Sequence, residues 1–141
     1  MGHSVLSELA TFLPKGSTAH IVAYPKYVDA AELKSLTFPG LAVTFSASTG
    51  DIDELIAAAP AAAVIYNCVN PPYDKWVELW PPMAEAFLQY AERTGAVLAT
   101  CSNVYGYGPV DVPMSESLPL AATGVKAQVR VQMWNEAKAR N

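Results

Sequence analysis

The chain is poor in cysteine, histidine and basic residues, and each shortage excludes a class of protein. Two cysteines in 141 residues are too few for a disulfide scaffold, so we expect both thiols to be reduced. Cys68, Cys101, His3 and His20 are too sparse for a metal site, and we predict none. Nine Lys and Arg against 13 Asp and Glu, without a basic run, argue against a nucleic-acid partner.

Long apolar runs are lacking as well. No segment approaches the roughly 18 to 20 uncharged residues that cross a bilayer, and the amino terminus lacks the basic-then-apolar order of a signal peptide. We therefore expect a soluble, cytoplasmic protein with no membrane partner. Hydrophobic residues make up 52% of the chain, which is ample for the core of one domain spanning residues 1–141.

Short apolar runs alternate with helical patterns along the chain. The expected strands are residues 19–24, 41–45, 62–66 and 96–99. The expected helices are residues 4–12, 28–36, 51–59, 83–94 and 126–139, with Asp51 as an N-cap, Pro81 and Pro82 in a first turn, and Gly95 as a C-cap. A separate short amphipathic piece is expected at residues 76–80. This alternation predicts an α/β fold with a parallel sheet.

The segment 95–109 carries the most information about function. Its apolar run, Ala96 to Ala99, ends abruptly in hydroxyl, thiol and amide groups at Thr100, Cys101, Ser102 and Asn103. Open α/β sheets bind ligands at the carboxyl ends of buried strands, so these groups are candidates for a site. The alternative is an ordinary strand followed by a glycine turn.

The amino-acid sequence of this segment resembles the Ser-Ser-x-x-Val-Tyr-Gly motif of the NAD-dependent epimerase/dehydratase family, which comprises the extended short-chain dehydrogenases. Residues 104–106 match it outright, residues 64–72 look like that family's fourth strand and cofactor loop, and residues 113–120 are similar to the loop before its catalytic helix. The resemblance implies a three-layer Rossmann-like parallel sheet, NAD or NADP as cofactor, and a sugar-nucleotide or similar carbonyl or hydroxyl substrate.

Parts of the family pattern have no counterpart in this sequence. Gly2 matches only the last glycine of the family's Gly-x-x-Gly-x-x-Gly loop, and the strand before that loop is missing. Because that strand is central in the family's sheet, the resemblance implies an incomplete sheet in which strands 19–24 and 62–66 face each other across a gap, unless the sheet closes up. We expect a truncated member that also lacks the substrate half, or a short relative with a rearranged sheet.

The family's catalytic residues are only partly matched. The resemblance puts its Ser/Thr position on Cys101, with Thr100 and Ser102 beside it. Its Tyr-x-x-x-Lys pair falls on Lys126 and Arg130, and neither side chain is a phenol. Arginine does not give up its proton at neutral pH, so the usual acid–base step has no obvious agent.

Two alternatives remain for that step. A second register aligns Ala122 and Lys126 with the pair, which restores the lysine but not the tyrosine. Tyr105 and Tyr107 are the phenols that could substitute, although packing is the more common role of such a tyrosine. We keep Tyr105 as the candidate.

Cofactor and substrate contacts follow from the same resemblance. The expected cofactor residues are Gly2, Lys26, Cys68, Val69, Asn70 and Thr100. Lys26 stands where an acidic residue would bind the ribose of NAD, which favours the 2′-phosphate of NADP unless it is simply a solvated lysine. Tyr73 and Asn103 are expected at the substrate, and Trp76 either stacks on a ligand ring or packs in the core.

These observations lead to one expected function and two alternatives. The first is an epimerase, dehydratase or reductase of this family, impaired in catalysis, whose partners are a dinucleotide and a small-molecule substrate; a homodimer is possible. The second is a non-catalytic dinucleotide-sensing or protein-interaction module with the same layers. A flavodoxin-like domain fits less well, because no acidic phosphoacceptor cluster or phosphate loop follows a first strand.

Overall fold

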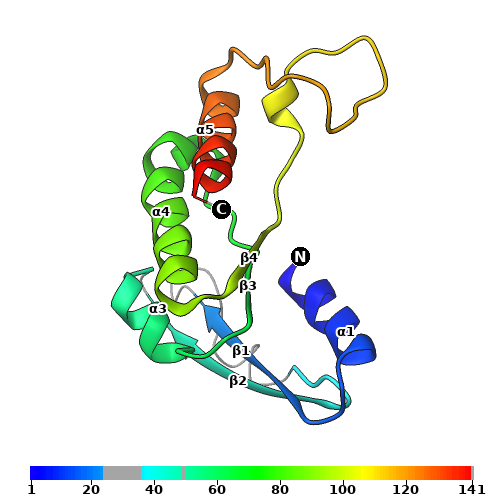
Figure 1. Ribbon diagram of the computed structural model, residues 1–141, viewed down its shortest axis with the longest axis vertical. Coiled ribbons are helices and arrows are strands. Elements are labelled where there is room, and N and C mark those ends of the chain that lie inside the picture. The colour runs from blue at the N-terminus through cyan, green and yellow to red at the C-terminus, as the bar shows by residue number, and fades with distance from the viewer. Residues whose placement is uncertain (24–35, 49, 141) are drawn as a thin grey trace.

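The computed structural model describes residues 1–23, 36–48 and 50–140. Its elements, in chain order, are α1 (Gly2–Phe12), β1 (Ser17–Ala23), β2 (Leu41–Ala47), α3 (Ile52–Ala58), β3 (Val64–Asn67), η1 (Tyr73–Lys75), α4 (Trp76–Thr94), β4 (Val97–Thr100), η2 (Tyr105–Tyr107) and α5 (Val125–Ala139) (Figure 1). The helix predicted at residues 28–36 lies, apart from its last residue, outside the described residues.

The strands pair as two parallel sheets. β1 pairs with β2, with Ser17 opposite Leu41, and β3 pairs with β4, with Val64 opposite Val97. The predicted α/β class with parallel strands is therefore confirmed. In the part of the chain that the structure describes, no backbone ladder joins β1 to β3, so the two strands predicted to flank a gap belong to different sheets.

Local signals place the helix ends close to their predicted positions. The Asp51 carboxylate accepts hydrogen bonds from the backbone N–H groups of Asp53 and Glu54, at 2.9 and 3.2 Å, and so caps α3. Gly95 ends α4 with a φ of 75°, and its N–H bonds to the Ala91 carbonyl. That left-handed conformation is one that glycine adopts without strain.

The long helix α4 differs from the prediction. It begins at Trp76 and runs without a break through Pro81 and Pro82 to Thr94, whereas the sequence predicted a separate piece before the two prolines. Each proline removes one backbone hydrogen bond, but these losses fall in the second turn of the helix. Burial of Trp76 and Trp80 against Val129 of α5 stabilises the first turn that the prolines would otherwise end.

The core between α3, α4 and the β3–β4 sheet is small. Leu55, Tyr90 and Ala96 form its buried centre, and Ile65 of β3 packs against them. The Tyr90 hydroxyl donates a hydrogen bond to the Ala59 carbonyl, so the end of α3 is tied to α4. The helices therefore cover one face of the β3–β4 sheet.

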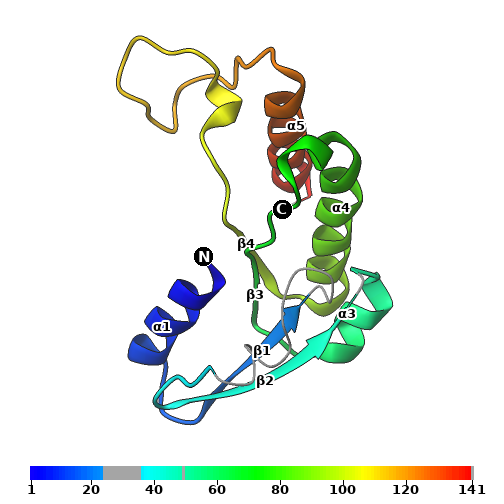
Figure 2. The same ribbon diagram turned by 180° about the vertical axis from the view of Figure 1, so that it is seen from behind.

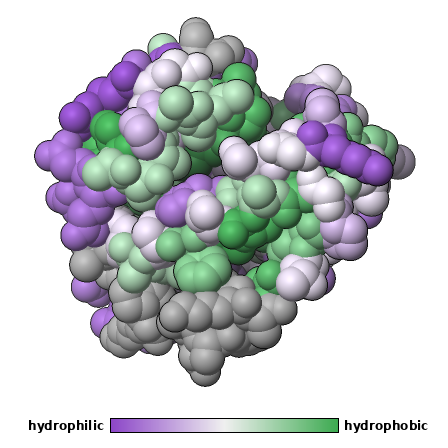
Figure 3. Space-filling view, turned by 90° about the horizontal axis from the view of Figure 1, so that it is seen from below, coloured by the Kyte–Doolittle hydropathy of each residue, from purple (hydrophilic) through white to green (hydrophobic). Residues whose placement is uncertain are grey.

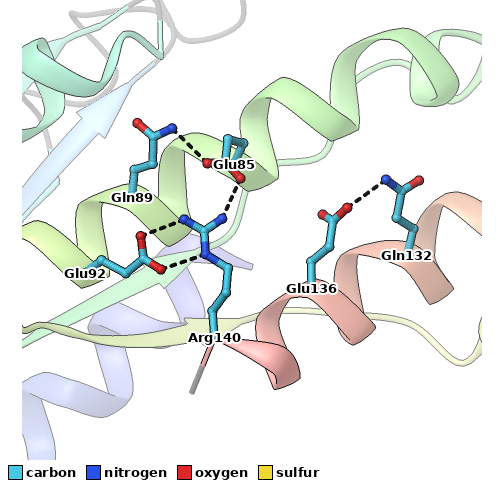
Figure 4. Close-up of polar contacts among 6 residues, drawn as sticks. All are labelled: Glu85, Gln89, Glu92, Gln132, Glu136 and Arg140. Atoms are coloured by element: carbon cyan, nitrogen blue, oxygen red, sulfur yellow. Dashed lines mark hydrogen bonds and ion pairs between the residues drawn. The ribbon is translucent and has the colours of Figure 1, made fainter.

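Helix α5 packs along α4 and is fixed there by an ion-pair cluster (Figures 2 and 4). The Arg140 guanidinium donates to both oxygens of Glu92, at 2.6 and 2.7 Å, and to Glu85 at 2.6 Å. These hydrogen bonds and charges lower the pKa of both carboxyl groups. This ion-pair cluster of Arg140 with Glu85 and Glu92 holds the C-terminal end of α5 on α4. It thereby helps to position the side chains at the N-terminal end of α5.

Candidate functional site

The carboxyl ends of β3 and β4 lie side by side and carry the two cysteines. Asn67 pairs with Thr100 in the parallel register, and the Cys101 N–H continues the ladder to the Asn67 carbonyl at 3.0 Å. The Sγ atoms of Cys68 and Cys101 are 3.7 Å apart. Burial, together with the hydrogen bond to Cys101 and the charge there, raises the pKa of Cys68 to about 11.

The amino end of α1 meets this edge of the sheet. A Cβ built on Gly2 would lie 3.8 Å from the Cys68 Cβ, and the chain's N-terminus stands beside the end of β4 in Figures 1 and 2. The first N–H groups of a helix are unpaired and carry partial positive charge. The structure thus brings Gly2 and Cys68, two of the predicted cofactor residues, together.

The loop after β3 is shaped by a buried amide. Asn67 is only 2% exposed, and its Oδ1 accepts a hydrogen bond from the Val69 N–H at 3.2 Å. This turn leaves Val69 half-buried and Asn70 exposed, while Thr100 is exposed at the end of β4. These three predicted residues therefore lie around the end of the β3–β4 sheet, whereas Lys26 lies outside the described residues.

Arg130 of α5 reaches the residue that follows Cys101. Its Nη2 donates to the Ser102 Oγ at 3.4 Å, and its Nη1 contacts the Met133 Sδ at 3.8 Å. The guanidinium carbon lies 4.5 Å from the ring centre of Trp80 and 5.4 Å from that of Trp76. The structure thus joins Ser102 and Arg130, two of the predicted catalytic residues, through a contact at the long end of hydrogen-bond distance.

The environment of Arg130 is unusual for a cation. The side chain is 6% exposed, its Nε has no hydrogen-bond partner, and no carboxylate pairs with it in the ranges 1–23, 36–48 and 50–140. Burial lowers the pKa of Arg130, yet a guanidinium remains protonated in proteins. Among the described residues, this buried positive charge is therefore offset by aromatic rings and by the neutral contacts to Ser102 and Met133.

The other predicted catalytic residues have aromatic partners. The Lys126 Nζ lies 3.5 Å from the centre of the Tyr73 ring. Tyr73 in turn packs edge-on against Trp76, at 5.0 Å between ring centres, and the Tyr105 ring lies 5.9 Å from Trp76. Trp76 is thus buried in an aromatic network that also touches Arg130, which favours the core-packing interpretation of this residue over a free stacking platform.

The motif segment after Ser102 has a structural role. The Asn103 Oδ1 accepts a hydrogen bond from the Tyr105 N–H at 3.2 Å, so this predicted substrate residue shapes the turn into η2. A Cβ on Gly106 would lie 3.1 Å from Leu120, and one on Gly108 would lie 3.0 Å from the Ala122 Cα. Gly106 of the motif and Gly108, two residues after it, allow this close packing.

Sequence reasoning missed Trp80 and Met133 at this site. Trp80 is 1% exposed and supplies the ring nearest to the Arg130 guanidinium. The spacing of Trp76 and Trp80, four positions apart, places both on one helix face. This spacing is visible in the sequence, but the predicted separation of residues 76–80 from the helix, as a short piece of their own, hides the shared face.

The described part of the chain holds no group of three or more His, Cys, Asp or Glu side chains arranged as metal ligands. Within the same residues, no helix combines the length and apolarity that a bilayer crossing requires.

Comparisons with protein-family models, curated proteins and solved structures gave no match.

Proposed function

We propose that this chain is a dinucleotide-binding α/β domain of the NAD-dependent epimerase/dehydratase type, which holds NAD or NADP at the carboxyl ends of β3 and β4 and is impaired in catalysis on a sugar-nucleotide substrate. The main support is the contact between Ser102 and Arg130. It joins a hydroxyl beside the residue that the resemblance aligns with the family's Ser/Thr, Cys101, to the residue that it aligns with the family's lysine.

The donor set suits an anionic ligand with hydroxyl groups. The orphaned Nε of Arg130 marks a buried positive charge that a phosphate or ribose oxygen would satisfy. The amino end of α1, where Gly2 lies against Cys68, has N–H groups suited to a pyrophosphate. Cys68 and Val69, at the carboxyl end of β3, would offer small side chains against which a ring could pack.

The bound dinucleotide would supply the hydride acceptor, and the chain would have to move the proton. Arg130 cannot act as a base because its guanidinium keeps its proton. Lys126 lies against the Tyr73 ring, and Tyr105 packs near Trp76. Binding without efficient turnover is therefore the expected behaviour.

Calorimetric titration with NAD, NADH, NADP and NADPH tests the binding half of this proposal. We expect saturable binding of at least one dinucleotide. When sugar nucleotides are then added, we expect no detectable change in the absorbance of the reduced nicotinamide. Rapid turnover would contradict the impairment, whereas the absence of binding to all four would contradict the cofactor role.

The interaction-module alternative is favoured by one observation. The face of the β3–β4 sheet opposite α3 and α4 carries Val64, Tyr66 and Val97, which are 39%, 40% and 64% exposed. Separately, Figure 3, which views the molecule from the end that carries β1 and β2, shows apolar residues at the surface there. If Val97→Lys abolishes association with a partner while leaving dinucleotide binding unchanged, this face mediates an interaction separate from the cofactor site.

A further inference from the structure

The two cysteines form a close pair in an otherwise cysteine-free chain. Cys68 follows directly after β3, and Cys101 follows directly after the neighbouring strand β4, 33 positions later; their Sγ atoms are 3.7 Å apart. A disulfide requires about 2.05 Å between the sulfur atoms and about 4.4 to 6.8 Å between the Cα atoms. Neighbouring strands are about 4.8 Å apart, which falls within this Cα range, so the two cysteines are within reach of a disulfide.

The surroundings permit chemistry at these thiols. Both cysteines are half-buried rather than enclosed, so a small molecule can approach them. Thr100 and Ser102, which flank Cys101 in the chain, are exposed. The backbone on both sides is held by the β3–β4 ladder and its continuation from Cys101 to Asn67, which keeps the two thiols together.

We propose that Cys68 and Cys101 form a reversible intramolecular disulfide by exchange with a small-molecule disulfide such as oxidised glutathione. The Cys101 thiolate attacks the small disulfide, forming a mixed disulfide and releasing one thiolate. Cys68 then attacks Cys101, which forms the internal bond and releases the second thiolate. Two protein thiols are oxidised, one small disulfide is reduced to two thiols, and the protons pass to the released thiolates.

The order of attack follows from the environment of Cys68. Burial raises its pKa to about 11, aided by the hydrogen bond to Cys101 and the charge there, while the nearby amino terminus acts in the opposite direction. Cys68 is therefore a poor first nucleophile. Once Cys101 carries glutathione, its contribution to the raised pKa of Cys68 is removed, and the second step becomes easier.

Mass spectrometry of the intact protein after incubation with oxidised glutathione tests this proposal. The wild type should lose about two mass units, corresponding to two hydrogens, and carry no glutathione. Subsequent dithiothreitol should restore the original mass. Retained glutathione on both cysteines, an unchanged mass, or a disulfide-linked dimer in place of the internal bond would each overturn it.

Two matched variants test the order of attack. Cys68→Ser should accumulate a mixed disulfide between Cys101 and glutathione, because no second thiol resolves it. Cys101→Ser removes the contribution of Cys101 to the raised pKa of Cys68 but leaves the larger contribution of burial. This variant should therefore still acquire glutathione more slowly than Cys68→Ser at neutral pH, and the difference should shrink as the pH rises. Equal rates for the two variants would contradict the assignment of Cys101 as first nucleophile. None of these measurements requires dinucleotide binding.

Discussion

Arg130 on α5 donates to Ser102 after β4 across 3.4 Å, although the two residues are 28 positions apart. The contact brings the amino-terminal half of α5 to the carboxyl end of the β3–β4 sheet. Because the guanidinium is buried without a carboxylate among the described residues, its desolvation is only partly offset by Trp76 and Trp80. Such a residue is better explained by ligand binding than by stability.

Replacement of Arg130 by methionine should therefore cost little stability. Methionine keeps much of the buried volume and removes the desolvated charge, so we expect a free energy of unfolding within about 1 kcal/mol of the wild type, or higher. Urea unfolding measures this, with the exposed Lys138→Met on the same helix as the control. A loss above about 3 kcal/mol, unmatched by Lys138→Met, would show that Arg130 is a structural residue.

Gly108→Ala should destabilise the protein more than Gly95→Ala. Both glycines have positive φ, 73° and 75°. Gly95 has a ψ of 10° and is left-handed helical, where alanine costs about 1 kcal/mol, whereas Gly108 has a ψ of −160°, in a region essentially restricted to glycine, where alanine costs more. Only at Gly108 does the added Cβ also approach another backbone, at 3.0 Å from the Ala122 Cα. Backbone strain and this close contact both predict a larger fall in the unfolding midpoint for Gly108→Ala, and equal losses for the two variants would contradict the prediction.

Asp51→Ala should remove the cap of α3 and cost about 1 kcal/mol. Asp51→Asn keeps the side-chain oxygen that accepts from Asp53 and Glu54 and should cost much less. Thermal unfolding of the two variants distinguishes the hydrogen bonds from the charge. If both lose equal stability, the negative charge at the helix start is the dominant contribution.

The ion-pair cluster of Arg140 with Glu85 and Glu92 should make the stability of the protein fall as the pH is lowered into the acid range. Arg140 lowers the pKa of Glu85 and Glu92 below their unfolded values, so its contribution is complete above the unfolded pKa, about 4.3, and is lost as pH falls through the lowered pKa values. Melting temperatures of wild type and Arg140→Gln should differ at about pH 7 and converge towards about pH 2. A difference that grows on acidification would refute this linkage.

The sequence predicted the elements with strong local signals. Asp51 and Gly95 mark helix ends through hydrogen bonds and backbone conformation that depend only on neighbouring residues, so both caps are confirmed. The prolines of α4 misled the prediction because the burial of Trp76 and Trp80 on Val129, a contact from another helix, determines where that helix begins. Local patterns contain no information about such a partner.

In the candidate site too, the features that depend on local sequence were predictable, and those that depend on packing between helices were not. The position of Cys101 after an apolar strand placed it at the edge of the sheet, and parallel pairing then accounts for its proximity to Cys68. The partners of Lys126 and Arg130 were not predictable, because they depend on how α5 packs against α4. The resemblance named these residues, but only the packing shows that one contacts Ser102 and the other Tyr73.

The most direct test of the proposed site is to map the residues that bind the dinucleotide by nuclear magnetic resonance, with wild-type protein labelled with nitrogen-15. At saturation, the amide signals of Cys68 and Ser102 and the Nε signal of Arg130 should shift, and Arg130→Met should weaken binding by about tenfold, equivalent to about 1.4 kcal/mol. Shifts confined to residues away from the ends of β3 and β4, or no shifts at all, would contradict the proposed site.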